Sequence, residues 1–194
     1  MTFPRLTPVA MAVALGLSLV LSGCTSSIES EDPMYQSDKS GHDGAMDTSK
    51  PASELLQRML DLNDETTKVH GGDWTFSGPD RAPWEKSTAG YFGRACPGSD
   101  PVSYHYVGMI MGPAVDDPEE AVSKYVSHFE KQGFSEVGRF NEDVPSDIGS
   151  GYYIIVTLED AEGNALIYQA GNHLSSLSYE GPCSEDPNMR VPTT

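Results

Sequence analysis

The segments Gly151-Tyr-Tyr-Ile-Ile-Val-Thr-Leu158 and Ala165-Leu-Ile-Tyr-Gln-Ala170 decide the fold of this chain. The first consists mainly of β-branched and aromatic residues, which favour strands, and the second contains Ile167 and Tyr168. Residues 159–164 separate them and include Gly163 and Asn164, which tolerate the positive φ angles of tight turns. The two segments therefore predict a β-hairpin.

Further strands are expected on both sides of this hairpin. Alternating or apolar runs predict strands over 73–77, 102–111 and 134–140 before it, and over 173–179 after it. Strands that follow one another along the chain pair as antiparallel neighbours. The predicted fold class is therefore α+β: an antiparallel sheet of about five strands with two helices packed on one face.

Two segments have helical periodicity. The first, 51–69, places its leucines on one face and is followed by two glycines. The second, 118–132, has Asp117 as a capping residue, Pro118 at the first helical position and Gly133 at its end.

The amino terminus has the parts of an export signal. An apolar run of about 14 residues, 8–21, is too short to span a membrane core, which needs roughly 20. It is followed by Leu21-Ser22-Gly23-Cys24, which resembles the bacterial lipobox. We expect residues 1–23 to be a lipoprotein signal peptide and Cys24 to carry the lipid. The alternative is an ordinary secretory signal with a cysteine there by chance.

The expected domain organisation follows from this anchor. Residues 24–50 are acidic and serine-rich and predict a flexible tether, because they cannot bury enough apolar surface to fold. Residues 51–183 predict a single α+β domain, and 184–194 a loose tail. The expected location is the extracytoplasmic side of the cell membrane, held there by lipid.

Cys96 and Cys183 are the remaining cysteines. On the oxidising side of a membrane, two cysteines most simply form a disulfide. The alternatives are that the two cysteines bind a metal or that one of them is a reactive thiol.

The charge of the chain excludes one class of partner. There are 12 basic and 29 acidic residues, a formal net charge of −17. Nucleic acids and anionic lipid surfaces are bound through basic patches, so we expect no nucleic-acid partner.

The layout of the chain is similar to that of the LppA-type lipoproteins of mycobacteria and related actinobacteria. The similarity lies in the lipobox, Asp73-Trp-Thr-Phe76, Cys96, Gly151-Tyr152, and Ser178 before Gly181-Pro182-Cys183. It implies an α+β lipoprotein of the cell envelope, and it provides no catalytic residues.

Sequence motifs for catalysis or cofactors are missing. The chain has no Gly-x-Ser-x-Gly, His-Glu-x-x-His, phosphate-loop or dinucleotide pattern, and we predict no catalytic residues, no cofactor and no metal. Ser150 lies between glycines, which is more typical of a turn. Asp160, Glu162 and Asn164 have the spacing that opens a calcium loop, although a hairpin turn explains the same residues. The histidines stand singly, at positions 42, 70, 105, 128 and 173.

Aromatic residues are the strongest functional lead. Trp74, Trp84, Tyr104 and Tyr106 are candidate ligand-binding residues for a groove that takes a peptide or a glycan. We favour the interpretation that the tyrosines pack in the core, and we expect helix 118–132 to cover them. We expect a non-enzymatic binding or accessory module whose partner is an envelope protein or a cell-wall ligand. The competing hypothesis is an envelope hydrolase with an unrecognised active site.

Overall fold

The structure is a computed structural model that describes residues 49–86, 91, 93–98, 102–144 and 151–190, with only the backbone described for 142–144. The predicted signal peptide, Cys24, most of the tether and Ser150 lie outside the described residues.

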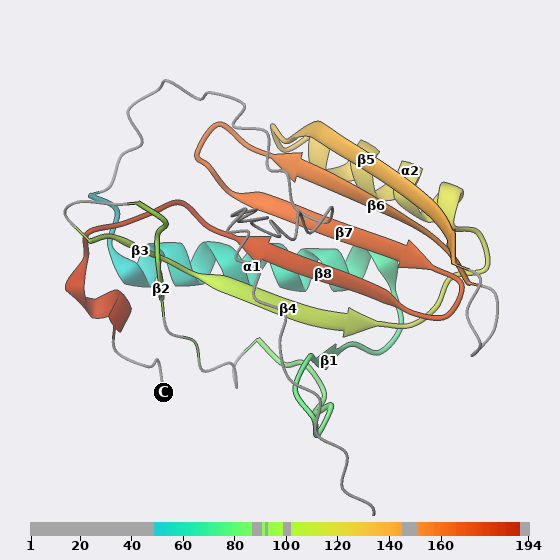
Figure 1. Ribbon diagram of the computed structural model, residues 1–194, viewed down its shortest axis with the longest axis horizontal. Coiled ribbons are helices and arrows are strands. Elements are labelled where there is room, and N and C mark those ends of the chain that lie inside the picture. The colour runs from blue at the N-terminus through green and yellow to red at the C-terminus, as the bar shows by residue number, and fades with distance from the viewer. Residues whose placement is uncertain (1–48, 87–90, 92, 99–101, 145–150, 191–194) are drawn as a thin grey trace, which may run out of the picture. The chain divides into compact units, whose positions relative to one another are not determined.

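The main element is a six-stranded antiparallel sheet with the strand order β1-β4-β8-β7-β6-β5 (Figure 1). A separate two-stranded sheet pairs β2 with β3. The strands are β1 Thr75–Phe76, β2 Arg94–Ala95, β3 Tyr104–His105, β4 Val107–Gly112, β5 Ser135–Val144, β6 Gly151–Glu159, β7 Ala165–Gly171 and β8 Ser175–Glu180. The predicted α+β class is confirmed, with one strand more in the main sheet than expected.

The predicted hairpin is the centre of the sheet. In β6, Ile154, Val156 and Leu158 are buried and alternate with residues that are partly exposed. Val156 lies opposite Tyr168 of β7, whose buried residues point to the same face. This alternation assigns one face of the sheet to the core.

Both helices lie on that face, behind the sheet in Figure 1. Helix α1, Ala52–His70, packs on β4 and β8, and helix α2, Pro118–Glu130, packs on β5, β6 and β7. Tyr125 of α2 stacks on Tyr168 with a centroid separation of 3.9 Å. Among the described residues, neither helix has the length and apolar character needed to cross a membrane.

The start of α2 has the predicted cap. Asp117 accepts a hydrogen bond through Oδ1 from the backbone N–H of Glu120 at 3.0 Å, and Pro118 occupies the first turn. Acidic residues in this turn also interact favourably with the positive end of the helix dipole.

The segment 102–111, expected as one strand, is divided between two sheets. Tyr104 and His105 form β3 and pair with β2, whereas β4 begins at Val107 and pairs with β8 and β1. Tyr106 lies at the junction and is 1% exposed.

The expectation that helix 118–132 covers Tyr104 and Tyr106 is also wrong. Helix α1 is the one that packs on β4: a Cβ placed on Gly108 would lie 3.4 Å from Met59 Sδ of α1. Tyr104, outside the main sheet, has the Arg190 guanidinium 4.8 Å above its ring. Helix α2 packs on β5, β6 and β7, in the other half of the sheet.

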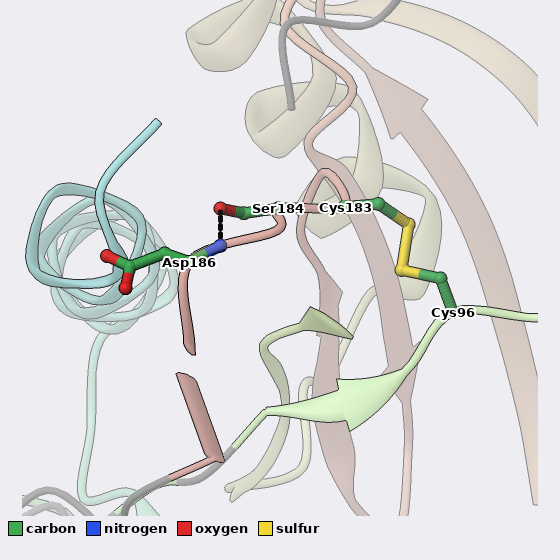
Figure 2. The surroundings of a disulfide bond; sticks show 4 residues. All are labelled: Cys96, Cys183, Ser184 and Asp186. Carbon is green, nitrogen blue, oxygen red and sulfur yellow. Dashed lines mark hydrogen bonds between the residues drawn. A yellow bond between two sulfur atoms is a disulfide. The ribbon is translucent and has the colours of Figure 1, made fainter. Parts of the chain in front are cut away.

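The Cys96–Cys183 disulfide is present and joins the residue after β2 to the segment that follows β8 (Figure 2). Beyond it, the prediction of a loose tail from residue 184 is wrong for 184–190. Ser184 exchanges two backbone hydrogen bonds with Tyr104, at 2.7 and 2.8 Å. The 3-10 helix η1, Pro187–Arg190, then buries Met189 completely. Residues 191–194 lie outside the described part.

Candidate functional site

A groove brings the two tryptophans of the chain together. It has a volume of about 730 Å³, within the range of roughly 300–1,000 Å³ typical of small-molecule sites. Its lining includes Trp74, Trp84, Asp64, Asp73, Glu85 and Lys86. We call this the tryptophan groove.

The tryptophans meet because the chain doubles back between them. The backbone N–H of Trp84 donates to the carbonyl of Trp74 at 2.8 Å, and Phe76 N–H donates to Ala82 O at 2.9 Å. These bonds hold residues 74–84 as a narrow loop that continues β1. Trp74 and Trp84 are therefore side by side at the base of this loop.

Trp74 is fixed and forms part of the wall. Its Nε1–H donates to Gly71 O at 3.2 Å, and its ring is so close to Gly112 that a Cβ there would lie 2.6 Å from ring carbons. It is 5% exposed, whereas Trp84 is half-buried. Trp84 therefore offers more ring surface to a ligand.

The charges around the groove are mainly negative. Three carboxylates, Asp64, Asp73 and Glu85, line it together with one lysine, Lys86. Lys86 forms an ion pair with Asp61 on α1, and Asp64 pairs with Lys68 at 2.5 Å. The lining thus combines aromatic rings with an excess of carboxylates.

A buried polar cluster lies behind Trp84, and sequence reasoning missed it. Tyr91 interacts with the side chains of Trp84 and Asn63, and burial raises the pKa of the Tyr91 phenol. Asn63 is a polar residue on the core face of α1, and it is 1% exposed. Residues four positions apart lie on the same face of a helix. The signal in the sequence was therefore a polar residue four positions after Met59.

The other two candidate residues lie outside this groove. Tyr106 is part of the hydrophobic core, and Tyr104 packs against it from the edge, beneath Arg190. The structure thus groups Trp74 with Trp84 and separates both from Tyr104 and Tyr106. Whether any of them binds a ligand stays a prediction.

The histidines in the described part have separate environments, and no group of three His, Cys, Asp or Glu residues that could hold a metal occurs there. His70 Nε2 lies 3.2 Å from Pro113 O and Nδ1 lies 2.6 Å from Tyr168 Oη. Because a carbonyl only accepts, Nε2 carries the proton and Nδ1 accepts from Tyr168. Burial lowers the pKa of His70.

The acidic turn between β6 and β7 has internal partners. Asp160 Oδ1 accepts from the backbone N–H groups of Glu162 and Asn164, both at 2.9 Å. Its Oδ2 accepts from Asn164 Nδ2 at 2.8 Å. These bonds are those of a hairpin turn stabilised by its first carboxylate, the simpler of the two interpretations of this spacing.

No family model and no curated protein matches the chain. The structure is similar to the crystal structure of a DUF4853 family protein from Actinomyces odontolyticus, an actinobacterium, with 17% sequence identity over 71% of each chain and a TM-score of 0.46. The resemblance to the LppA-type lipoproteins stays a prediction.

Proposed function

We propose that this protein is a lipid-anchored, non-enzymatic binding module on the extracytoplasmic side of the cell membrane. Its ligand is a cationic segment of an envelope protein or of a cell-wall component, held in the tryptophan groove. The observation that carries the proposal is that Trp74 and Trp84 share one groove with three carboxylates.

The chemistry of the groove favours a cation. An ammonium or guanidinium group is attracted to the face of an indole ring, and tryptophan gives the strongest such interaction among the aromatic residues. Asp73 and Glu85 in the lining supply opposite charge, whereas Asp64 is paired with Lys68. The net charge of −17 also raises the local concentration of cationic ligands and increases their association rate.

A direct test of the groove is calorimetric titration with tetralysine amide at low salt. We expect saturable binding that the Trp84→Ala variant weakens by about tenfold, which corresponds to about 1.4 kcal/mol. Asp73→Asn should also weaken binding, and it tests the groove without removing a packed ring. Phe140→Ala is the matched aromatic control, because Phe140 lies on β5 and is 53% exposed.

The outcome that refutes the groove is unambiguous. Binding that is absent in the unchanged protein, or equally strong in Trp84→Ala and Asp73→Asn, would exclude the tryptophan groove as a cation site. Binding of a neutral oligosaccharide in place of tetralysine would change the ligand class to a glycan.

The lipid anchor has its own test. Cys24→Ala should move the protein from the detergent phase to the aqueous phase, because stable anchoring depends on the acyl chains at this residue. The control is Cys96→Ser combined with Cys183→Ser, which removes two cysteines and leaves Cys24. Retention of the Cys24→Ala protein on the membrane would refute the anchor.

A further inference from the structure

A second groove lies between the carboxyl-terminal halves of α1 and α2, and its charge is unlike that of the rest of the chain. It has a volume of about 500 Å³. Three lysines line it: Lys68 from α1, Lys124 from α2, and Lys131 at the end of α2. They are a quarter of the 12 basic residues of a chain whose formal net charge is −17. We call this the lysine groove.

The carboxylate in its lining is already engaged. Glu65 Oε1 lies 2.7 Å from His128 Nε2 and accepts a hydrogen bond from Gln132 Nε2 at 2.6 Å. Lys68 is paired with Asp64. In the part of the chain that the structure describes, no carboxylate lies within 4.0 Å of the ammonium groups of Lys124 and Lys131. These two charges are therefore available to a ligand.

Helix electrostatics account for only part of this arrangement. Lys68 and Lys131 lie at the ends of their helices, where a positive charge interacts favourably with the helix dipole. Lys124 lies in the middle of α2, so the dipole does not explain its position. The apolar side chain of Val69 and the side chain of Ser127 also line the groove.

We propose that the lysine groove binds the phosphate group of a small phosphorylated ligand. Lysine ammonium groups bind phosphate as point charges, and a serine hydroxyl such as that of Ser127 adds a hydrogen bond. A discrete ligand is favoured over an anionic membrane surface because the lysines are gathered in one groove of an otherwise acidic chain. A flat anionic surface would meet the surrounding carboxylates as well as the lysines.

The test uses inorganic pyrophosphate as the probe. The protein is the Cys24→Ala chain without the predicted signal peptide, 1–23, so that neither the apolar run 8–21 nor an acyl group binds vesicles. Calorimetric titration at low salt should show saturable binding of pyrophosphate. Lys124→Gln and Lys131→Gln should each weaken it by about fivefold or more, because each removes a charged hydrogen-bond donor. The control is Lys50→Gln, since Lys50 pairs with Glu162 at 2.8 Å in another part of the fold.

The alternatives give distinct results. No saturation in the unchanged protein, or equal affinities for all three lysine variants, would overturn the proposal. Flotation with phosphatidylglycerol vesicles without pyrophosphate binding would overturn it in favour of a membrane surface. The proposal is independent of the tryptophan groove, so Trp84→Ala should bind pyrophosphate as the unchanged protein does.

Discussion

The carboxylate of Asp186 accepts a hydrogen bond from the backbone N–H of Ala52, the first residue of α1, at 2.8 Å. Pro51, the residue before the helix, has no side-chain acceptor, so a residue 134 positions away supplies the cap. Ser184 Oγ accepts from Asp186 N–H at 3.1 Å and lies next to the disulfide (Figure 2). The segment after the last strand thus connects the disulfide to the start of the first helix.

Removal of this cap should destabilise the protein. We expect Asp186→Ala to lower the urea midpoint, because the first turn of α1 loses an acceptor for one of its free N–H groups. Asp80→Ala is the control, since it removes the same charge from an exposed loop. Equal midpoints for the two variants would contradict the capping role.

The disulfide should contribute a large part of the stability. It joins residues 87 positions apart, and chain-entropy reasoning gives about 4–5 kcal/mol for a loop of that length. Urea unfolding with and without reductant measures this difference.

The presence of the bond has a separate test. Alkylation without reductant, followed by intact-mass measurement, should modify neither Cys96 nor Cys183. Two labelled thiols in protein from the envelope would contradict the bond.

The two neighbouring tyrosines should differ in their effect on stability. Tyr106→Ala should cost about 3–5 kcal/mol, because the side chain is 1% exposed and part of the core. Tyr104→Ala should cost less, no more than about 2 kcal/mol, because its ring is only half-buried. Urea denaturation of both variants tests this, and a larger cost for Tyr104→Ala would contradict the described packing.

The half-buried His70 should make the protein less stable in mild acid. Burial lowers its pKa below the ordinary value of 6.5, so the unfolded chain binds more protons just below that pH. Its contribution to stability is present above pH 6.5 and is lost as the pH falls through the lowered pKa. His70→Gln should lose less stability than the unchanged protein as the pH falls below 6.5, measured by thermal unfolding. Parallel pH profiles would contradict this role.

Local patterns were sufficient to predict much of this fold. The β6–β7 hairpin, both helices and the Asp117 cap are each encoded in a single local stretch of the chain, and all are present. The disulfide also followed from the count of cysteines. These features could be predicted because they depend on neighbouring residues or on a single remaining pairing.

Features that depend on distant residues were not predicted. The division of 102–111 is set by pairing with β2 on one side and β8 on the other, which alternation alone does not reveal. The cap by Asp186 likewise depends on a segment far away in the sequence. Trp74 and Trp84 were named from their type, but their shared groove depends on the doubled-back loop between them.

The central claim is that the tryptophan groove binds a cationic ligand. It is tested most directly by nuclear magnetic resonance titration of the labelled Cys24→Ala chain with tetralysine amide. We expect the largest saturable shifts at the Trp84 indole N–H and at the backbone amides of Asp73 and Glu85. Shifts that spread over the acidic surface without saturation, or that cluster on the exposed strand residues Met109 and Phe140, would contradict it.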